Sequence, residues 1–342
     1  MKRKIVYVGF AFTHHKGTHA GYHQIKDWIN FDYVIDCQSF YEKCAKNKEE
    51  LSILDRIRRK ILYMILGVSS VPWYIAKIIW LGLIQGNLVF HFIYGENTFF
   101  SWIKYLVRKS NRFVCTFHQP VDFFKQNKRQ LRLLKSSDMI ILVGNTEVEI
   151  FKAITGKNNV VYIPHGISSD FYNVDMSIIK ENIVLTVGNW LRDYEFADKV
   201  YSSLLEKDPT LEIHIVSNPT NKQYISLNPR IKFLSGISDE DLKLEYLKCS
   251  VLFLPLKRYT ANNSLLEASS TGCNIVISSD FPDNSYIPEK YITITSMNVN
   301  NAVEAILRVR SYNHNLDLSG YIYKHYSWEY VANKTLDLFE RI

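Results

Sequence analysis

Short apolar segments alternate with helical patterns along most of this 342-residue chain. A strand that is apolar throughout is buried on both faces, so helices must cover it on both sides. The alternation therefore predicts parallel sheets between layers of helices, which is the α/β class.

The predicted strands are too numerous for one compact unit of this length, so we expect two doubly wound domains. The first would hold strands 4–9, 33–37, 87–93, 112–117, 138–143 and 159–163. The second would hold strands 182–188, 211–216, 230–234, 250–254, 274–278 and 291–295. The boundary is expected at Pro164, because Pro and Gly follow a strand there and a polar segment comes next.

Composition restricts the class of partner. Hydrophobic residues make up 47% of the chain and charged residues 22%, which is typical of a globular protein. The net charge of +7 suits anionic partners such as nucleoside diphosphates or phospholipid head groups. No basic run is interleaved with stacking aromatic residues, so we expect no nucleic-acid partner.

The cysteines are scattered and no signal peptide is found, which predicts reduced thiols in a cytoplasmic protein.

The segment 251–280 carries the clearest local signal. It reads as a buried strand, a polar loop, a short helix and a second buried strand. Asn262, Asn263 and Ser264 are N-cap candidates, and Glu267 follows Ser264 by three residues, as in a capping box. Gly272 is expected to end the helix.

A phosphate site is predicted from this segment. A helix that starts at the carboxyl edge of a parallel sheet presents backbone N–H groups and a positive dipole end to an anion. Lys257 and Arg258, in the loop before the helix, add two cations.

The same segment resembles the donor-binding segment of nucleotide-sugar-dependent glycosyltransferases with the GT-B fold, in particular retaining family 4. Leu265-Leu266-Glu267-Ala268 and Gly272 match the family pattern L-L-E-A-x-x-x-G. The resemblance implies that Glu267 binds the ribose hydroxyls of the donor. The family often has a second glutamate eight residues earlier, which contacts the donor sugar, and this chain has Tyr259 there.

Two further matches extend the resemblance over nearly the whole chain. Residues 163–171 match the family segment I-P-x-G-[IV]-x-x-x-F, which starts the second domain, and Ser327-Trp328-Glu329 resembles the start of the family's last helix. The resemblance implies two Rossmann-like domains that face each other across a cleft, with a C-terminal helix crossing back. The expected bounds are 1–164 for the acceptor domain, 165–326 for the nucleotide-sugar domain and 327–342 for the helix.

The loop after the first strand is rich in glycine and histidine. By resemblance, Lys16 and Gly17 lie near the donor phosphates. His15, His19 and His23 have the i, i+4, i+8 spacing of one helix face, which offers a metal site as an alternative. Glycines interrupt that helix and no Asp, Glu or Cys completes the set, so we expect no metal.

Later loops supply the other candidates. Thr116-Phe117-His118 matches the family's T-x-H, which implies that His118 lies near the reacting sugar, although a histidine often simply ends a strand. Glu96 follows another strand and is a candidate base, or alternatively a helix cap. Val187-Gly188 and Arg192 resemble the family's V-G-x-x-x-x-[KR] type of loop, although three residues rather than four separate Gly188 from Arg192, and Asn189 is the first of them. An Arg fork suits bidentate phosphate contact, whereas the structural alternative is an ion pair with Asp193 or Glu195. The predicted set is therefore His118, Arg192 and Glu96 for catalysis, and Lys16, Gly17, Gly188, Asn189, Arg192, Lys257, Arg258, Asn263, Ser264, Leu265 and Glu267 for the donor.

The resemblance implies metal-independent transfer of a sugar from a nucleoside diphosphate donor, UDP or GDP, to a hydroxyl of a glycan or lipid-linked acceptor, with retention of anomeric configuration. No separate cofactor is expected. The implied pathway is bacterial surface polysaccharide or lipopolysaccharide synthesis. Two alternatives stay open: a non-catalytic nucleotide-sugar-binding scaffold, and a GT-B nucleotide-sugar epimerase.

Residues 56–84 form the most hydrophobic part of the chain. Pro72, Lys77 and a Ser-Ser pair interrupt it, so it is not expected to span a membrane. Either it supplies core helices, or its basic and aromatic residues contact anionic lipid at the inner face of the cell membrane.

Overall fold

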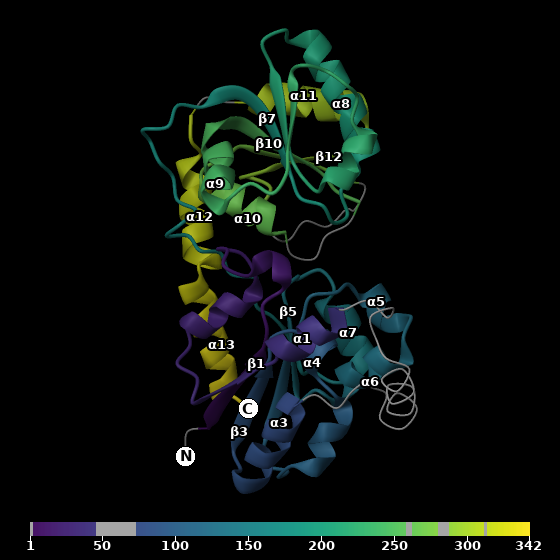
Figure 1. The fold of residues 1–342 in the computed structure, drawn as a ribbon, viewed down its shortest axis with the longest axis vertical. Coiled ribbons are helices and arrows are strands. Elements are labelled where there is room, and N and C mark those ends of the chain that lie inside the picture. The colour runs from purple at the N-terminus through teal and green to yellow at the C-terminus, as the bar shows by residue number, and fades with distance from the viewer. Residues whose placement is uncertain (1–2, 46–72, 258–261, 280–286, 311–312) are drawn as a thin grey trace. The chain divides into compact units, whose positions relative to one another are not determined.

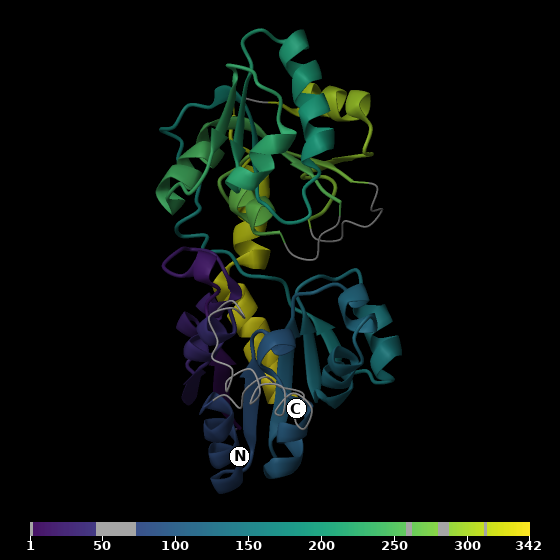
Figure 2. The same ribbon diagram turned by 45° about the vertical axis from the view of Figure 1, so that its right-hand side comes forward.

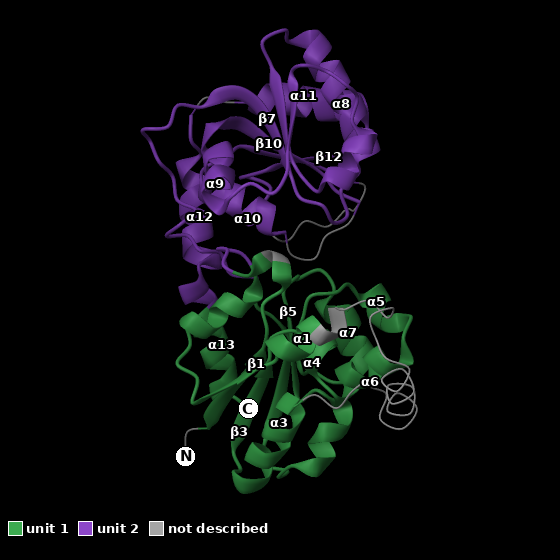
Figure 3. Ribbon diagram, in the orientation of Figure 1, with its two compact units in different colours: residues 1–16, 21–164, 332–342 green, residues 17–20, 165–331 purple. Residues whose placement is uncertain are grey.

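The computed structural model describes residues 3–45, 73–257, 262–279, 287–310 and 313–342. Two six-stranded sheets are found in these ranges, and every strand pair in them is parallel. The described chain divides into two compact units (Figure 3). Unit 1 comprises residues 1–16, 21–164 and 332–342, and unit 2 comprises residues 17–20 and 165–331.

The sheet of unit 1 has the strand order β2-β1-β3-β4-β5-β6. Its strands are β1 (Lys4–Gly9), β2 (Tyr33–Asp36), β3 (Leu88–Phe92), β4 (Arg112–Phe117), β5 (Met139–Leu142) and β6 (Val160–Tyr162). The helices of this part of the chain are α1 (Gln38–Ala45), α3 (Trp73–Ile84), α4 (Gly95–Thr98), α5 (Val121–Lys125), α6 (Lys128–Ser136) and α7 (Val148–Thr155), with 3-10 turns η1 (Thr13–His15), η2 (Tyr22–Asp27) and η4 (Ser101–Leu106). All five residues of β3 are buried, as expected for a central strand covered on both faces.

The sheet of unit 2 has the strand order β12-β11-β10-β7-β8-β9. Its strands are β7 (Glu181–Val187), β8 (Glu212–Val216), β9 (Ile231–Leu234), β10 (Cys249–Pro255), β11 (Ile275–Ser278) and β12 (Thr293–Thr295). The helices that follow are α8 (Tyr194–Lys207), α9 (Asp239–Lys248), α10 (Asn263–Ser270), α11 (Val299–Val309), α12 (Leu316–Tyr326) and α13 (Trp328–Glu340), with the 3-10 turn η5 (Pro219–Tyr224). Each of the twelve predicted strands is therefore confirmed within two residues at either end.

The core of unit 2 shows why its strands are apolar throughout. Leu252 and Leu254 of β10 pack with residues of α10 and α12 on one face of the sheet. Val251 and Phe253 pack with residues of α8 and α11 on the other face. Figure 1 shows α8 and α11 on the opposite side of this sheet from α9, α10 and α12, and Figure 2 gives a second view of the same layers. The strand period of two thus divides each run between two cores.

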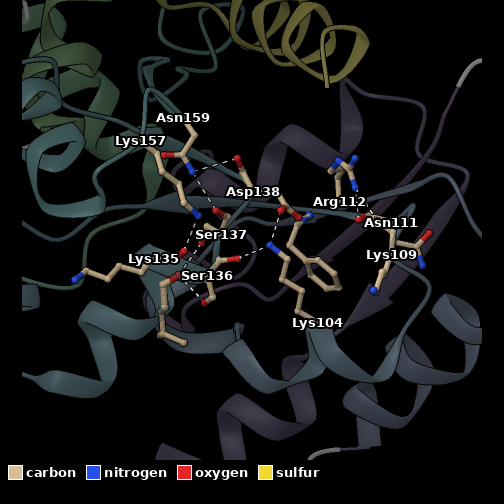
Figure 4. A network of polar contacts seen from close by, with 12 residues as sticks. Lys104, Lys109, Asn111, Arg112, Lys135, Ser136, Ser137, Asp138, Lys157 and Asn159 are labelled. Atoms are coloured by element: carbon tan, nitrogen blue, oxygen red, sulfur yellow. Dashed lines mark hydrogen bonds and ion pairs between the residues drawn. The ribbon is translucent and has the colours of Figure 1, made fainter.

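Polar side chains hold the amino-terminal edge of the unit 1 sheet together (Figure 4). Asp138, just before β5, accepts a hydrogen bond from the backbone N–H of Phe113 at 2.8 Å and pairs with Lys104. Asn159, just before β6, donates to the carbonyl groups of Ser137 and Asp138 at 3.0 and 3.1 Å. These contacts fix the starts of the neighbouring strands β4, β5 and β6.

The strand order places one topological switch point in each sheet. In unit 1 the order reverses between β1 and β3, and in unit 2 it reverses between β7 and β10. Ligands of open α/β sheets bind beyond the carboxyl ends of the strands at such points. The loops after β1, β3, β7 and β10 are therefore the expected positions of ligand-binding residues.

Substitution of two glycines, Gly272 after α10 and Gly320 within α12, tests whether the backbone after α10 requires a residue without Cβ. Gly272 has φ of 76°, and an added Cβ would lie 3.2 Å from the backbone N of Asn315. Gly320, within α12, has open space around an added Cβ. We expect Gly272→Ala to lower the free energy of unfolding by roughly 1–3 kcal/mol, and Gly320→Ala to raise it by up to about 1 kcal/mol. Urea unfolding measures both, and equal effects of the two substitutions would contradict this account.

Candidate functional site

The loop after β7 is shaped around the guanidinium group of Arg192. Gly188 has φ of 116°, and an added Cβ would lie 2.7 Å from Arg192 Nη2. Arg192 donates from Nε to the carbonyl of Val187 at 3.1 Å and from Nη1 to the carbonyl of Trp190 at 3.0 Å. Gly188 therefore serves the close packing of this side chain against its own loop, which only a residue without Cβ permits.

The same loop is fixed to the end of β10. The N–H of Asp193 donates to the carbonyl of Pro255 at 2.9 Å, and the N–H of Lys257 donates to the carbonyl of Leu191 at 3.0 Å. Arg192 and Leu256 form an antiparallel bridge between these segments. The two strands that flank the switch point are thus joined by their following loops, and Arg192 lies at the junction.

Asn262 connects Arg192 to the start of α10. Its side-chain oxygen accepts from the N–H of Leu265 at 3.2 Å, which caps the helix, and from Arg192 Nη2 at 3.2 Å. The capping box predicted from Ser264 and Glu267 is therefore wrong, because the helix starts at Asn263 with Asn262 as its cap. Asn263, Ser264 and Leu265 form the first turn, as the predicted donor-binding segment requires.

Arg192 is a cation without a carboxylate partner among the described residues. Neither expected ion pair, with Asp193 or with Glu195, is formed among the described residues, and Asp193 instead caps α8 and pairs with Lys257 at 3.6 Å. Burial lowers the pKa of Arg192. An arginine has five N–H donors, and three are used by the contacts above. The remaining donors, beside a helix N-terminus, form a site suited to a phosphate group.

Glu267 lies one turn further along α10 and is 4% exposed. Tyr246 of α9 donates its hydroxyl hydrogen bond to Glu267 Oε2 at 2.9 Å. Burial raises the pKa of Glu267 to about 7, and the nearby charge of Asp239 contributes in the same direction. A buried carboxyl group of this kind is suited to accept hydrogen bonds from hydroxyl groups of a ligand.

Other predicted donor residues have different surroundings. The side-chain oxygen of Asn189 accepts from Ser217 Oγ at 2.9 Å and from the N–H of Asn218 at 2.5 Å, so it braces the loop after β8. Lys257 is exposed and pairs with Asp193. Arg258 and Tyr259 lie outside the described residues.

A second group of candidates meets at the carboxyl edge of the unit 1 sheet. Glu96 lies in the first turn of α4, after β3, and its Oε1 accepts from the backbone N–H of His118 at 3.2 Å. The imidazole Nδ1 of His118 is 3.6 Å from the same oxygen. The rings of Tyr94 and Tyr22 flank this imidazole, with centroid distances of 4.7 and 5.1 Å. The structure thus brings His118 and Glu96 together, as the sequence analysis grouped them.

Sequence reasoning missed several residues behind these groups. His91, within β3, is fully buried and its Nε2 lies 2.8 Å from Thr116 Oγ1. Burial lowers its pKa to about 3, with a further contribution from His118, so it is neutral at physiological pH. A histidine inside the apolar run LVFHF was the available signal. Tyr246 carried no comparable signal, because its contact with Glu267 depends on the packing of α9 against α10.

The loop after β1 is divided between the units. Lys16 belongs to unit 1, where its exposed side chain pairs with Glu42 at 3.7 Å. Gly17, with φ of 76°, begins the short segment that belongs to unit 2. In that segment His19 stacks on Phe171 at a centroid distance of 3.6 Å, and its Nδ1 lies 3.0 Å from Asp239 Oδ2.

The three histidines of the alternative metal reading do not share a helix. His15 ends the turn η1, His23 lies in the separate turn η2, and His19 falls between them. In the part of the chain that the structure describes, no group of three or more His, Cys, Asp or Glu side chains has a metal-binding arrangement.

Comparison with known proteins gives the architecture a class. Neither a family model nor a curated protein sequence matches the chain. Among solved structures, the N-terminal domain of a Candida albicans trehalose-6-phosphate phosphatase has a TM-score of 0.67 at 12% identity, covering 100% of this chain and 98% of its own. The apo form of the lipopolysaccharide outer core galactosyltransferase WaaB has a TM-score of 0.63 at 14% identity, covering 99% and 100%.

HepE of Anabaena, in complex with UDP and glucose, also has a TM-score of 0.63, at 11% identity and with 99% and 100% coverage. At these identities the likeness concerns the fold. The protein has the GT-B architecture of two Rossmann-like domains, and its structural neighbours include GT-B glycosyltransferases.

The pKa of Glu267 predicts a pH dependence of stability. The folded-state value of about 7 lies above the ordinary 4.5, so the folded protein binds more protons than the unfolded chain between these values. The stabilisation that the protonated Glu267 carboxyl group gives the folded protein is complete below about pH 4.5 and is lost as pH rises through about 7. We expect the free energy of unfolding of Glu267→Gln, relative to wild type, to increase by up to about 3 kcal/mol over this range. Urea unfolding at several pH values measures it, and a constant difference would contradict it.

Proposed function

We propose that this protein is a retaining GT-B glycosyltransferase, which transfers a sugar from a nucleoside diphosphate sugar to a hydroxyl of a glycan or lipid-linked acceptor. The observation that carries the proposal is the contiguous set in unit 2 of Arg192, Asn262 and Glu267 at the switch point. This set offers a phosphate-binding cation, a capped helix N-terminus and a buried carboxyl group, in the order that a nucleoside diphosphate requires. The complex of the structural neighbour HepE with UDP and glucose supports this ligand class.

The proposed reaction places most of its demand on the leaving group. When the bond between the sugar and the diphosphate breaks, negative charge grows on the phosphate oxygen. Arg192, its position fixed by two backbone carbonyls, would stabilise that charge without moving. The leaving phosphate would assist removal of the acceptor proton on the same face of the sugar, so no dedicated nucleophile is assigned.

Unit 1 is proposed to bind the acceptor. His118 would donate a hydrogen bond to a sugar hydroxyl. Glu96 would hold the loop of His118 through the backbone N–H and orient the imidazole. His91 stays neutral behind these residues.

A second reading is a subunit that binds the nucleotide sugar without transferring it. Tyr259 stands where the resembling family has the glutamate that contacts the donor sugar. Donor binding without product formation would favour this reading over transfer.

Membrane contact is proposed through unit 1. No described helix is long and apolar enough to cross a bilayer. Helix α3 buries Tyr74, Ile75 and Ile78 but leaves Trp80 and Leu83 64% and 52% exposed. Arg108 donates to the carbonyl of Leu83 at 2.7 Å, which places a cation beside this apolar face.

Exposed Trp and Leu next to basic residues are typical of surfaces that contact anionic lipid. An acceptor held at such a lipid surface fits surface glycan synthesis. Residues 56–72, the basic start of the predicted region, lie outside the described residues.

The donor site is tested by nucleotide binding. A ligand that binds only the folded state raises the melting temperature, so UDP, GDP, ADP and CMP, with their sugars, are screened in EDTA by thermal shift. We expect one base to give a clear shift, Glu267→Ala to abolish it, and Glu304→Ala, an exposed glutamate of α11, to preserve it. Unchanged affinity in Glu267→Ala would reject the assigned site.

The lipid surface is tested by co-sedimentation with phosphatidylcholine vesicles, with and without phosphatidylserine. We expect binding only to the anionic vesicles, and a loss of roughly tenfold in the double variant Trp80→Ser, Leu83→Ser, because apolar burial and charge act together. Leu227→Ser, which alters a 98% exposed leucine of unit 2, is the matched control. Equal binding by all three proteins would exclude α3 as the contact surface.

A further inference from the structure

Trp190 is an exposed indole within the loop that holds Arg192. Its side chain is 75% exposed, although large aromatic residues gain most from burial. Across the described residues, the indole makes no ring contact or hydrogen bond, and only its backbone carbonyl is used, by Arg192. Folding therefore gives this side chain no evident role.

The backbone beneath Trp190 is strained and firmly held. Leu191 has φ of 57°, in the left-handed region that residues other than glycine rarely adopt. The carbonyl of Leu191 accepts from the N–H of Lys257 at 3.0 Å, and the neighbouring Asp193 N–H donates to Pro255 at 2.9 Å. Strain of this kind persists where the surroundings impose it, and it concentrates at ligand sites. The loop thus fixes the backbone from which the indole projects, beside Arg192 of the proposed donor site.

The two faces of the sheet indicate which part of a ligand would reach this indole. Glu267 lies on α10, whose residues pack on the face shared with α9 and α12. Trp190 precedes α8, whose residues pack on the opposite face. Arg192 lies between these two sides, beside the N-terminus of α10. A ligand with its ribose at Glu267 and its diphosphate at Arg192 would therefore extend its sugar away from Glu267, toward the side of Trp190.

We propose that Trp190 is a stacking platform for a pyranose ring. The C–H groups on one face of a pyranose are apolar and slightly positive, and they match the negative face of an indole. This inference rests on the proposed function, because it assigns a sugar-binding residue to the same site. The ring belongs either to the donor or to the acceptor glycan, and the chemistry of the contact is the same for both.

Intrinsic fluorescence tests the proposal directly. Wild type, Trp190→Phe, Trp190→Ala and the control Trp28→Phe are titrated with UDP, UDP-glucose, GDP, GDP-mannose, methyl glucoside and methyl galactoside. Stacking on the indole is expected to quench emission in wild type and in Trp28→Phe but not in Trp190→Phe. Trp28 is a suitable control because it is also exposed, at 43%, and lies in unit 1.

Affinity separates the two sources of the sugar. Trp190→Ala is expected to weaken binding of the sugar nucleotide roughly tenfold, with less than about a twofold change for the bare nucleotide, if the donor sugar is stacked. If the acceptor sugar is stacked, the methyl glycosides alone lose affinity. Trp190→Phe, which keeps an aromatic face, is expected to bind within about threefold of wild type in either case.

Two results would overturn the proposal, and they differ in scope. Wild-type binding of a sugar nucleotide, with the same affinities in Trp190→Ala for every ligand, would reject the role of Trp190 and leave the donor site in place. No binding of any nucleotide or glycoside by wild type would reject both. Melting temperatures of the variants establish that each is folded.

Discussion

The parallel pairing of β7 with β10 is the constraint on which the proposed donor site depends. Val251 pairs with Val184 and Leu252 with Leu185, so both strands end at the same edge of the sheet. Because the order of strands reverses there, the following loops diverge to helices on opposite faces, α8 and α10. The hydrogen bonds of Asp193 to Pro255 and of Lys257 to Leu191 hold these two loops together beyond the strand ends.

At this edge of the sheet, backbone carbonyl groups do most of the work of positioning the Arg192 side chain. The guanidinium of Arg192 is oriented by carbonyls and by the capping oxygen of Asn262, rather than by a carboxylate. An ion pair would have neutralised the field that an anionic ligand meets, whereas neutral acceptors hold the group and leave its charge available. The carboxyl group of Glu267 also has a neutral partner, because the hydroxyl of Tyr246 donates a hydrogen bond to it. Arg192 therefore keeps its charge available for a ligand, whereas Glu267, whose pKa burial raises to about 7, keeps carboxyl oxygens that can accept hydrogen bonds.

The fold was predictable from sequence because apolar strands and turn residues are local signals, and all twelve strands lie within two residues of their predicted bounds. The loop grouping of Arg192 with the start of α10 was also accessible, since strand ends meet at one edge. The sequence analysis offered Asn262, Asn263 and Ser264 as N-caps because their propensities are similar, and the hydrogen bond from the N–H of Leu265 identifies Asn262 as the cap. The contact of Tyr246 with Glu267 and the inclusion of residues 17–20 in unit 2 depend on packing between segments distant in sequence, which no local pattern encodes.

The chain path has a consequence for synthesis. Unit 1 contains both β1 and residues 332–342, which include most of α13. The ring of Phe339 in α13 packs against His91 of the central strand β3, with 5.3 Å between the ring centroids. While the ribosome is still making unit 2, the nascent unit 1 lacks that cover and exposes part of a buried strand. Folding of unit 1 can be completed only after residues 332–342 have left the ribosome, so of the two units the one that is begun first is finished last.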